Sequence, residues 1–434
     1  MTAPVNTLAD TVTKQQGSLE LLENFGPFCS PEVMNMKFRE FNKTAINNYG
    51  NAVSISVPVR YVSQGSLVVN NFQGTEQKFE TLVCGVEDKV NPDNSTVGAV
   101  PLAFDAQEIT FNVANWLDDF GRSAVAELAD RIQRNVAKEV LNSYRFYGAT
   151  SGSGLINSYG QLDKARRKLN NFGSALGKRI MIIPDTAASD ILNNGLDQFA
   201  VDRGNEDANS WKIAAQADTI YYTSNLLPQQ TAGAAGDENI QLTLTAVNPD
   251  GTELTLSGAG TLANAAREND ILMLDNLNAT RLVFLTWIGH GPSQQRPSVR
   301  ITADADSVGD VLVVTVDPPL IVAGTPNTTP NANLNIDPLT ADAGSGVGCK
   351  IIPSHTAGIL MGGNPFFLAM PPLPDQSPYE TANNYDERTG VSIRLTKGAQ
   401  FGGNTYGYVL DGQWGKKIFA DYVERLIFPL DGGF

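Results

Sequence analysis

The stretch AVAELADRIQRNVAKEVLNSYRFYG, residues 124–148, decides the fold, because it is the one long helical pattern in a chain otherwise patterned as strands and turns. Apolar residues recur in it at steps of three and four, which predicts a single apolar stripe on an amphipathic helix. The predicted stripe consists of Val125, Leu128, Ile132, Val136, Val140 and Tyr144. Ser123 is a plausible N-cap and Gly148 a plausible C-terminal glycine, so we expect a rod of about 39 Å. Its charged faces should meet water or partners.

The length and composition of the chain are those of a globular protein. The chain has 434 residues, of which 42% are hydrophobic and 18% charged, enough for two or three domains. The start, MTAPVNTLADTVTKQQ, lacks the apolar core of a signal peptide, and no apolar run reaches the roughly 18 residues of a membrane helix. Cys29, Cys84 and Cys349 are scattered, which disfavours a disulfide framework or a zinc site. We therefore expect a soluble protein, made in a cytoplasm, without membrane contact.

The formal charge of −15 opposes direct wrapping of nucleic acid, which needs clustered lysine and arginine. It fits either a basic protein partner or a surface kept soluble by repulsion.

The segments around the rod read mostly as strands. Residues 52–62, AVSISVPVRYV, alternate as a half-buried strand, with Pro58 marking an edge, and residues 108–116 alternate likewise. After the rod come a shorter helix at 160–173, a short buried strand at Arg179–Ile183 and a helix capped by Asp185 or Thr186. The end, IFADYVERLIF, reads as one buried strand.

A compositional break begins at residue 229. No lysine occurs between Lys212 and Lys350, and residues 229–340 carry twelve acidic residues against four arginines. Dense strand signals separated by turns rich in Gly, Asn, Asp and Pro predict a small antiparallel barrel or sandwich inserted into another domain.

No catalytic, cofactor or metal site stands out. The Gly258-x-Gly260-x-x-Ala263 pattern is followed by a strand rather than a helix, so a hairpin turn is favoured over a dinucleotide site. The two histidines, His290 and His355, read as loop residues. Asp304, Asp306 and Asp310 fit a polar turn better than a calcium loop, and Lys164–Lys168 fits a solvated helix face better than a phosphate site. We predict that the chain is not an enzyme.

In order, these parts resemble the major capsid proteins of tailed phages with the HK-97-type fold. The chain is most similar to P-22-like coat proteins, which carry an inserted β-barrel I-domain. The resemblance rests on AVSISVPVRYV, on the long helix, on GKRIMIIPDTAASDIL and ADTIYYTSNLLPQQTAG, on NDILMLDN, and on HTAGILMGGNPFFLAMPPLP with DERTGVSIR and DGQWG.

The resemblance implies an α+β fold with these parts: N-terminal arm 1–48, E-loop and P-domain strand 49–115, P-domain spine helix 116–150, first A-domain segment 151–228, inserted I-domain 229–340, and A-domain remainder with C-terminal P-domain strands 341–434. Because TAVNPDGTELT is short, contacts that the family makes through a longer loop across its two-folds are expected on residues 289–298, with His290 and Arg296 as candidates.

The implied function is self-assembly into hexamers and pentamers of an icosahedral shell around phage DNA, which the chain would touch only indirectly and non-specifically. Implied partners are further copies, a scaffolding protein, a portal protein at one vertex and a decoration protein. Asp10, Glu20 and Glu23 are the candidates for receiving a basic scaffold helix. The location would be the virion capsid, assembled in the host bacterial cytoplasm. An encapsulin-like compartment and a secreted β-rich adhesin or surface-layer protein remain as alternatives.

Overall fold

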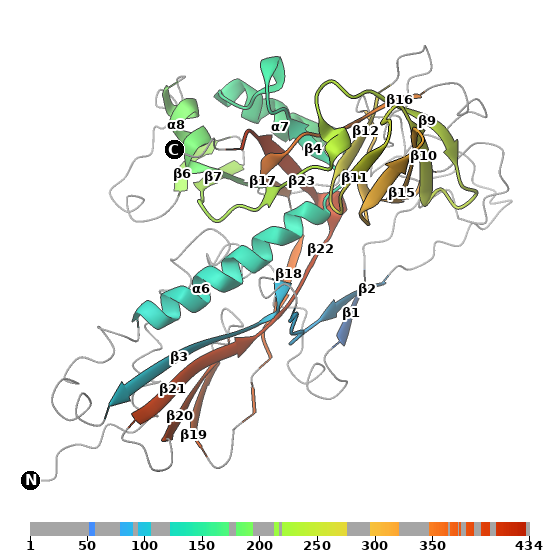
Figure 1. Cartoon of the computed structure of the whole chain (residues 1–434). Coiled ribbons are helices and arrows are strands. Elements are labelled where there is room, and N and C mark those ends of the chain that lie inside the picture. The colour runs from blue at the N-terminus through green and yellow to red at the C-terminus, as the bar shows by residue number, and fades with distance from the viewer. Residues whose placement is uncertain are drawn as a thin grey trace, which may run out of the picture.

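The computed structural model has a broad body, from which a long helix and a sheet project together as an arm (Figure 1). It describes residues 52–56, 79–89, 94–105, 122–172, 179–193, 212–216, 219–275, 296–320, 347–362, 365–371, 373–374, 379–385, 392–399 and 405–430. The predicted strand at 108–116 and the N-terminal arm at 1–48 lie outside these residues.

The arm is a four-stranded antiparallel sheet with helix α6, Arg122–Ala137, packed against it (Figure 1). Its strands, in order across the sheet, are β19 (Glu380–Tyr385), β20 (Ser392–Ala399), β21 (Thr405–Gln413) and β3 (Val97–Asp105). A Cβ on Gly98 would come 3.0 Å from Leu128 Cδ1 and 3.1 Å from Trp414 Cη2, so the glycine allows a close approach of the helix to β3. Trp414 is fully buried and donates its Nε1–H to Asn135 Oδ1 at 2.9 Å, which ties the end of the sheet to the helix.

Helix α6 is shorter than predicted. It ends at Ala137, after about 24 Å at 1.5 Å per residue, and tightens into a 3₁₀ turn at Lys138–Asn142. The last predicted helical residues form strand β4, Phe146–Gly148, which pairs in parallel with β23 (Val423–Phe428). Pairing with a buried strand outweighs helix propensity here. Gly148 is not a helix cap: its φ is +111°, and a Cβ there would lie 2.7 Å from the Ile427 carbonyl oxygen.

The predicted stripe is buried, but it serves two cores. Five of its members lie in the cluster between α6 and the sheets: Val125, Leu128, Ile132, Val136 and Val140. Tyr144 lies beyond the helix and packs into the barrel core instead. The expectation of one packed side holds in part: Glu127 and Arg134 are exposed, but Gln133 and Asn135 are buried in the second half of the helix.

The body is a mixed sheet with helices α7 (Tyr159–Phe172) and α8 (Asp185–Asn193) on one face and helix α6 on the other. Its strands, in order, are β4, β23, β17 (His355–Gly362), β5 (Arg179–Ile183), β7 (Thr219–Thr223) and β6 (Lys212–Gln216), and β8 (Gln229–Gln230) also pairs with β17. Helices α7 and α8 share one hydrophobic cluster with this sheet. The cluster of α6 includes Ile182 and Ile359 from the same strands, so the sheet is covered on both faces. That burial explains the continuous apolar run of Arg179–Ile183.

The inserted domain is a closed ring of six strands. Around the ring run β10 (Glu253–Ser257), β9 (Leu242–Val247), β16 (Val347–Ile351), β12 (Ile271–Asp275), β13 (Ser298–Ile301) and β15 (Val311–Asp317), which pairs back with β10. Two further strands, β14 (Ala305–Val308) and β11 (Leu262–Ala266), extend from β15.

The barrel bounds differ from the predicted 229–340. Residues 229–230 already belong to the body, because Gln229 pairs with Thr356 and Gln230 with His355. The ring also needs β16, which lies beyond residue 340 and pairs with both β9 and β12. The chain therefore leaves the body at β8 and returns beside it at β17.

Two smaller pairs complete the described structure. Strand β1 (Ala52–Ser56) pairs with β2 (Phe79–Val83), and β18 (Phe366–Ala369) pairs with β22 (Gly415–Ile418). The predicted single strand at the end of the chain is interrupted: β22 and β23 are separated by a 3₁₀ turn at Ala420–Tyr422.

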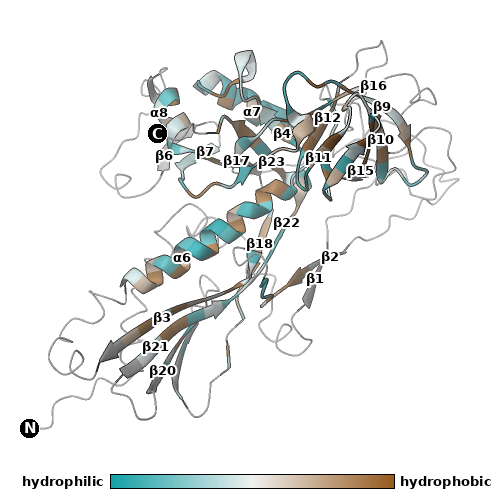
Figure 2. Cartoon of the chain, in the orientation of Figure 1, coloured by the Kyte–Doolittle hydropathy of each residue, from teal (hydrophilic) through white to brown (hydrophobic). Residues whose placement is uncertain are grey.

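Figure 2 shows hydrophobic and hydrophilic residues alternating around α6, and brown, hydrophobic residues on arm strands β3 and β21 as well as on strands of the barrel. No helix in the described part of the chain is long and apolar enough to cross a bilayer.

Candidate functional site at the barrel junction

Strand β23 is the place where helix α6, the body sheet and the barrel meet. Its residues Glu424 and Arg425 are both completely buried. Because successive side chains of a strand point to opposite faces, one charge faces helix α7 and the other faces the barrel. Buried charges cost free energy unless they are paired, so their partners define the site.

On the helix side, Glu424 Oε1 lies 3.0 Å from Lys168 Nζ of helix α7. Lys168 also donates to the Phe146 carbonyl of β4. Burial lowers the pKa of Lys168, while Glu424 acts to raise it. The guanidinium of Arg145 lies 3.8 Å from the Phe172 ring centroid and donates from Nη1 to the Asp421 carbonyl at 3.1 Å. The chain that follows α6 is thus held to α7 and to the C-terminal strands by charged groups.

On the barrel side, Arg425 Nη1 donates to the carbonyl oxygen of Asn269 at 2.9 Å, just before strand β12. Burial lowers the pKa of Arg425 to about 9, although the neighbouring Asp270 acts to raise it. Arg425 Nε and Nη2 have no hydrogen-bond partner within the described residues.

Asp270 fastens the barrel to the chain that leads into it. Its Oδ1 accepts the Gln230 Nε2–H, and its Oδ2 accepts the backbone N–H groups of Gly233 and Arg267, each at 2.9 Å. Burial raises the pKa of Asp270, and those three hydrogen bonds act to lower it. One buried carboxyl group therefore joins the last body strand before the insertion, the connecting segment and the barrel.

Arg300 of β13 joins the barrel to the end of the helix. Its Nη1 donates to Asn142 Oδ1 at 2.8 Å and to Asn269 Oδ1 at 3.0 Å, and its Nη2 lies 3.3 Å from Asp317 Oδ2. Beside it, Ser298 Oγ donates to the Tyr144 carbonyl at 2.7 Å. The 3₁₀ turn after α6 is therefore in direct contact with the barrel.

The sequence suggested a loop position for His355, but His355 is the buried first residue of strand β17. Its Nδ1 lies 2.6 Å from the Pro353 carbonyl oxygen. Burial lowers the pKa of His355 to about 3, and the positive charge of Arg425 acts in the same direction. The imidazole is therefore neutral at physiological pH.

The two sequence patterns that resembled ligand sites are structural. Asp304 accepts the Glu268 N–H at 2.7 Å, Asp306 accepts the Asn264 N–H at 2.6 Å, and Asp310 accepts the Gly258 N–H at 3.0 Å. These carboxylates hold the segment that contains Gly258 and Gly260, which leads into strand β11 and not into a helix. No group of three or more His, Cys, Asp or Glu residues in the described part of the chain is placed to hold a metal ion.

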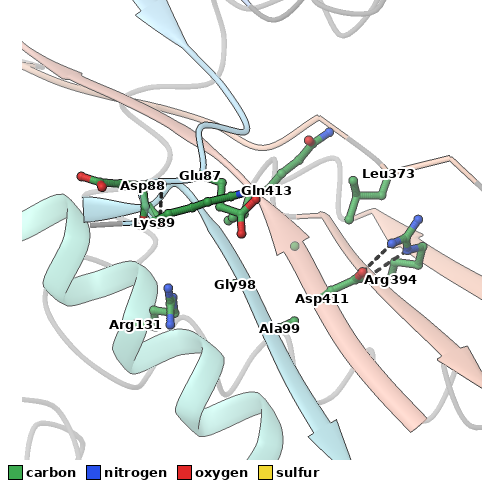
Figure 3. Close-up of a pocket in the computed structure, with 13 residues that line it drawn as sticks. Glu87, Asp88, Lys89, Gly98, Ala99, Arg131, Leu373, Arg394, Asp411 and Gln413 are labelled. Carbon is green, nitrogen blue, oxygen red and sulfur yellow. Dashed lines mark hydrogen bonds and ion pairs between the residues drawn. The ribbon is translucent and has the colours of Figure 1, made fainter. Parts of the chain in front are cut away.

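A cavity of about 550 Å³ lies between the arm sheet, helix α6 and residues 87–89 (Figure 3). Its charges are already engaged in part: Arg394 Nε donates to Asp411 Oδ1 at 2.9 Å and Arg394 Nη1 to the Pro374 carbonyl at 2.6 Å. Ser95 Oγ, the hydroxyl in its lining, donates to the Asp88 carbonyl at 3.2 Å. This cavity therefore has charged walls.

Of the predicted partner-binding residues, the described part of the chain includes Arg296 alone. Asp10, Glu20, Glu23 and His290 lie outside the described residues. Arg296 is exposed and precedes β13. The Lys164–Lys168 helix face is solvated only at Lys164 and Arg167, because Lys168 turns inward to Glu424. Sequence reasoning missed Glu424, Arg425, Asp270 and Arg300; the one available signal was an acid–base pair inside the apolar pattern VERLIF.

We predict that Asp270→Asn destabilises the protein by about 2 kcal/mol. Asparagine keeps one acceptor oxygen, so its NH₂ group must face N–H donors that Asp270 now satisfies, and those donors lose their partners. Urea unfolding checks the value, with Asp250→Asn in an exposed turn as the matched control. Equal stability of the two variants would contradict the fastening role of Asp270.

The burial of His355 leads us to predict that the folded protein loses stability in acid. The unfolded chain protonates it near pH 6.5 and the folded protein near pH 3, so the unfolded state binds more protons between these values, and stability falls as pH falls through that window. Between pH 7 and pH 4 the loss from this group is on the order of 3 kcal/mol.

His355→Asn, whose amide can still donate to the Pro353 carbonyl, should flatten this dependence. The measurement is the difference between wild-type and variant unfolding free energies at several pH values, since carboxyl groups common to both cancel. Parallel pH curves would refute it.

Comparisons with known proteins give structural matches alone. No protein-family model and no curated protein matches the sequence. Among solved structures, a chain from Mycobacterium phage Che8 matches with 9% identity and a TM-score of 0.40, over 91% of this chain and 90% of that one. The Cyanophage Pam1 capsid matches with 8% identity and a TM-score of 0.41, over 88% and 86%. The capsid of Cyanophage P-SCSP1u matches with 10% identity and a TM-score of 0.38, over 87% and 84%. At TM-scores below 0.5, we rest the function of this chain on its own residues and geometry.

Proposed function

We propose that this chain is the major capsid protein of a tailed phage and assembles into the icosahedral shell around its DNA. One observation carries the proposal: the rod α6 lies along the arm sheet and ends at a body sheet, between whose strands β8 and β17 a closed barrel is inserted. That succession of parts is the one implied by the sequence resemblance to P-22-like coat proteins with the HK-97-type fold and an I-domain.

The physical character of the parts suits a shell subunit. An arm that projects from the body offers long faces that a neighbouring copy can cover. A rod packed on that arm and fixed to the body can transmit geometry between neighbours. A closed barrel exposes no pairing edge around its ring, so it can stand on a crowded surface without strand-to-strand aggregation.

The finer parts of the proposal follow from the family. Copies would form hexamers and pentamers, with a portal protein at one vertex, decoration proteins as further partners and assembly in the bacterial cytoplasm. A scaffolding protein would bind the acidic N-terminal arm through Asp10, Glu20 and Glu23, because a cluster of acids attracts a basic helix. The inserted barrel favours this reading over an encapsulin-like compartment.

Negative-stain microscopy tests the proposal on the chain expressed alone and together with its neighbouring genes. We expect closed shells of uniform diameter in the second preparation. Monomers alone in both preparations would contradict the capsid function. Charge reversal at Asp10, Glu20 and Glu23 together should lower the shell yield when a scaffold is required, and an unchanged yield would remove the scaffold role from these residues while leaving the shell intact.

A further inference from the structure

The layer between the body sheet and the barrel contains three buried hydrogen-bonding atoms without partners. Two of them are Nε and Nη2 of Arg425, and the third is Nε2 of His355. Arg425 is 0% exposed and His355 1%, and none of the three atoms has a hydrogen-bond partner within the described residues. Burying a polar group without a partner costs stability, so native proteins retain few such groups. Three of them in one layer indicate that a further molecule satisfies them.

The strand pairing places both side chains on the same face of the body sheet. Ile359 of β17 pairs directly with Arg425 of β23, and paired residues share a face. His355 lies four residues before Ile359 in the same strand, and side chains of a strand alternate with a period of two, so His355 shares that face too. Arg425 and His355 therefore belong to one buried layer.

Hydrogen bonds to the barrel bring the two groups to the same short segment. Arg425 Nη1 donates to the Asn269 carbonyl oxygen at 2.9 Å. His355 pairs with Gln230 of β8, whose Nε2–H donates to Asp270 Oδ1 at 2.9 Å. The two side chains therefore flank two consecutive barrel residues, and the charge of Arg425 is near enough to act on the pKa of His355.

The unpartnered atoms are complementary in polarity. Nε and Nη2 of Arg425 can only donate hydrogen bonds. His355 Nδ1 lies 2.6 Å from the Pro353 carbonyl oxygen, which can only accept, so the single ring hydrogen of the neutral imidazole is on Nδ1. His355 Nε2 is therefore an acceptor. A molecule between the two side chains must accept from the arginine and donate to the histidine.

The charges around the two side chains favour a neutral molecule. The positive charge of Arg425 is matched by its neighbour Asp270. Arg300 Nη2 lies 3.3 Å from Asp317 Oδ2, so the second arginine of this layer has an acidic neighbour as well. An added anion would face the lone pair of His355 Nε2, and an added cation would face the donors of Arg425. Water both donates and accepts, and it satisfies buried polar groups in many proteins.

We propose that the barrel junction encloses an ordered water molecule, or two linked ones, that accepts from Arg425 and donates to His355 Nε2. The site is a property of the folded chain and does not rest on the capsid function. His355 is the first residue of β17, where the chain returns from the barrel, whereas Asp270 holds the segment by which the chain leaves the body. The water therefore ties the returning chain to β23, separately from the hydrogen bonds of Asp270.

A density map of the wild-type chain, at a resolution that shows ordered solvent, tests the site directly. We expect one peak, or two linked peaks, that join Arg425 Nε or Nη2 to His355 Nε2 by hydrogen bonds. Crystals grown in bromide should give no anomalous signal at this position, because the site excludes anions. A direct contact between the two side chains, a gap without density or a bromide signal would overturn the proposal.

Urea unfolding at neutral pH provides a second test. His355→Leu removes the acceptor, and Arg425→Met removes the donors while keeping an unbranched side chain. Each substitution alone already breaks the water bridge, so the unfolding constant of the double variant should be about tenfold smaller than the product of the two single effects. Arg394→Met is the matched control, because Arg394 is a buried arginine of the arm sheet. Its effect should multiply with that of His355→Leu without any such difference.

Independent effects in the junction pair, as expected for the control pair, would overturn the water bridge and leave the capsid function standing. Where a junction variant does not fold, the density of the wild-type chain decides alone.

Discussion

Adjacent buried charges on strand β23 are the constraint on which the rest of the structure depends. Glu424 and Arg425 cannot reach water, and they point to opposite faces of the body sheet. Each must be met by its own partner, Lys168 of α7 on one face and the barrel segment at Asn269 and Asp270 on the other. A hydrophobic pair would pack in many orientations, whereas a buried charge tolerates few, and we infer that these two residues orient the helix layer and the barrel on the sheet.

The junction also explains why the rod stops where it does. The chain after Ala137 must bring Asn142 to Arg300, the Tyr144 side chain into the barrel core and β4 alongside β23. An uninterrupted helix to residue 148 could not form the pairing of β4 with β23, since its backbone groups would be paired within the helix. The 3₁₀ turn is the transition between a rod that belongs to the arm and a strand that belongs to the body.

The local sequence pattern was sufficient to predict those helices and strands whose burial does not depend on distant segments. The helix at Tyr159–Phe172 and the alternation of β15 follow from periodicity, and the apolar run at Arg179–Ile183 follows from burial on both faces of the sheet. It failed where distant segments compete for the same residues: the end of α6, the role of Gly148, and the barrel edge at β16, whose partners lie about 100 and 75 residues earlier in the chain. The sequence could not show that these charged residues are buried, because a charged residue is expected to be exposed until its partner in the fold is known. The family resemblance rested on the order of parts, which survives these local errors.

A reconstruction of assembled shells at side-chain resolution would test the central claim most directly, which is that helix, sheet and barrel form one body around β23. We predict that subunits in five-fold and six-fold surroundings keep the Arg425–Asn269 and Asp270–Gly233 hydrogen bonds, and that differences between them are taken up in the arm. A barrel that turns on the body sheet between the two surroundings, with these bonds broken in one of them, would contradict the account.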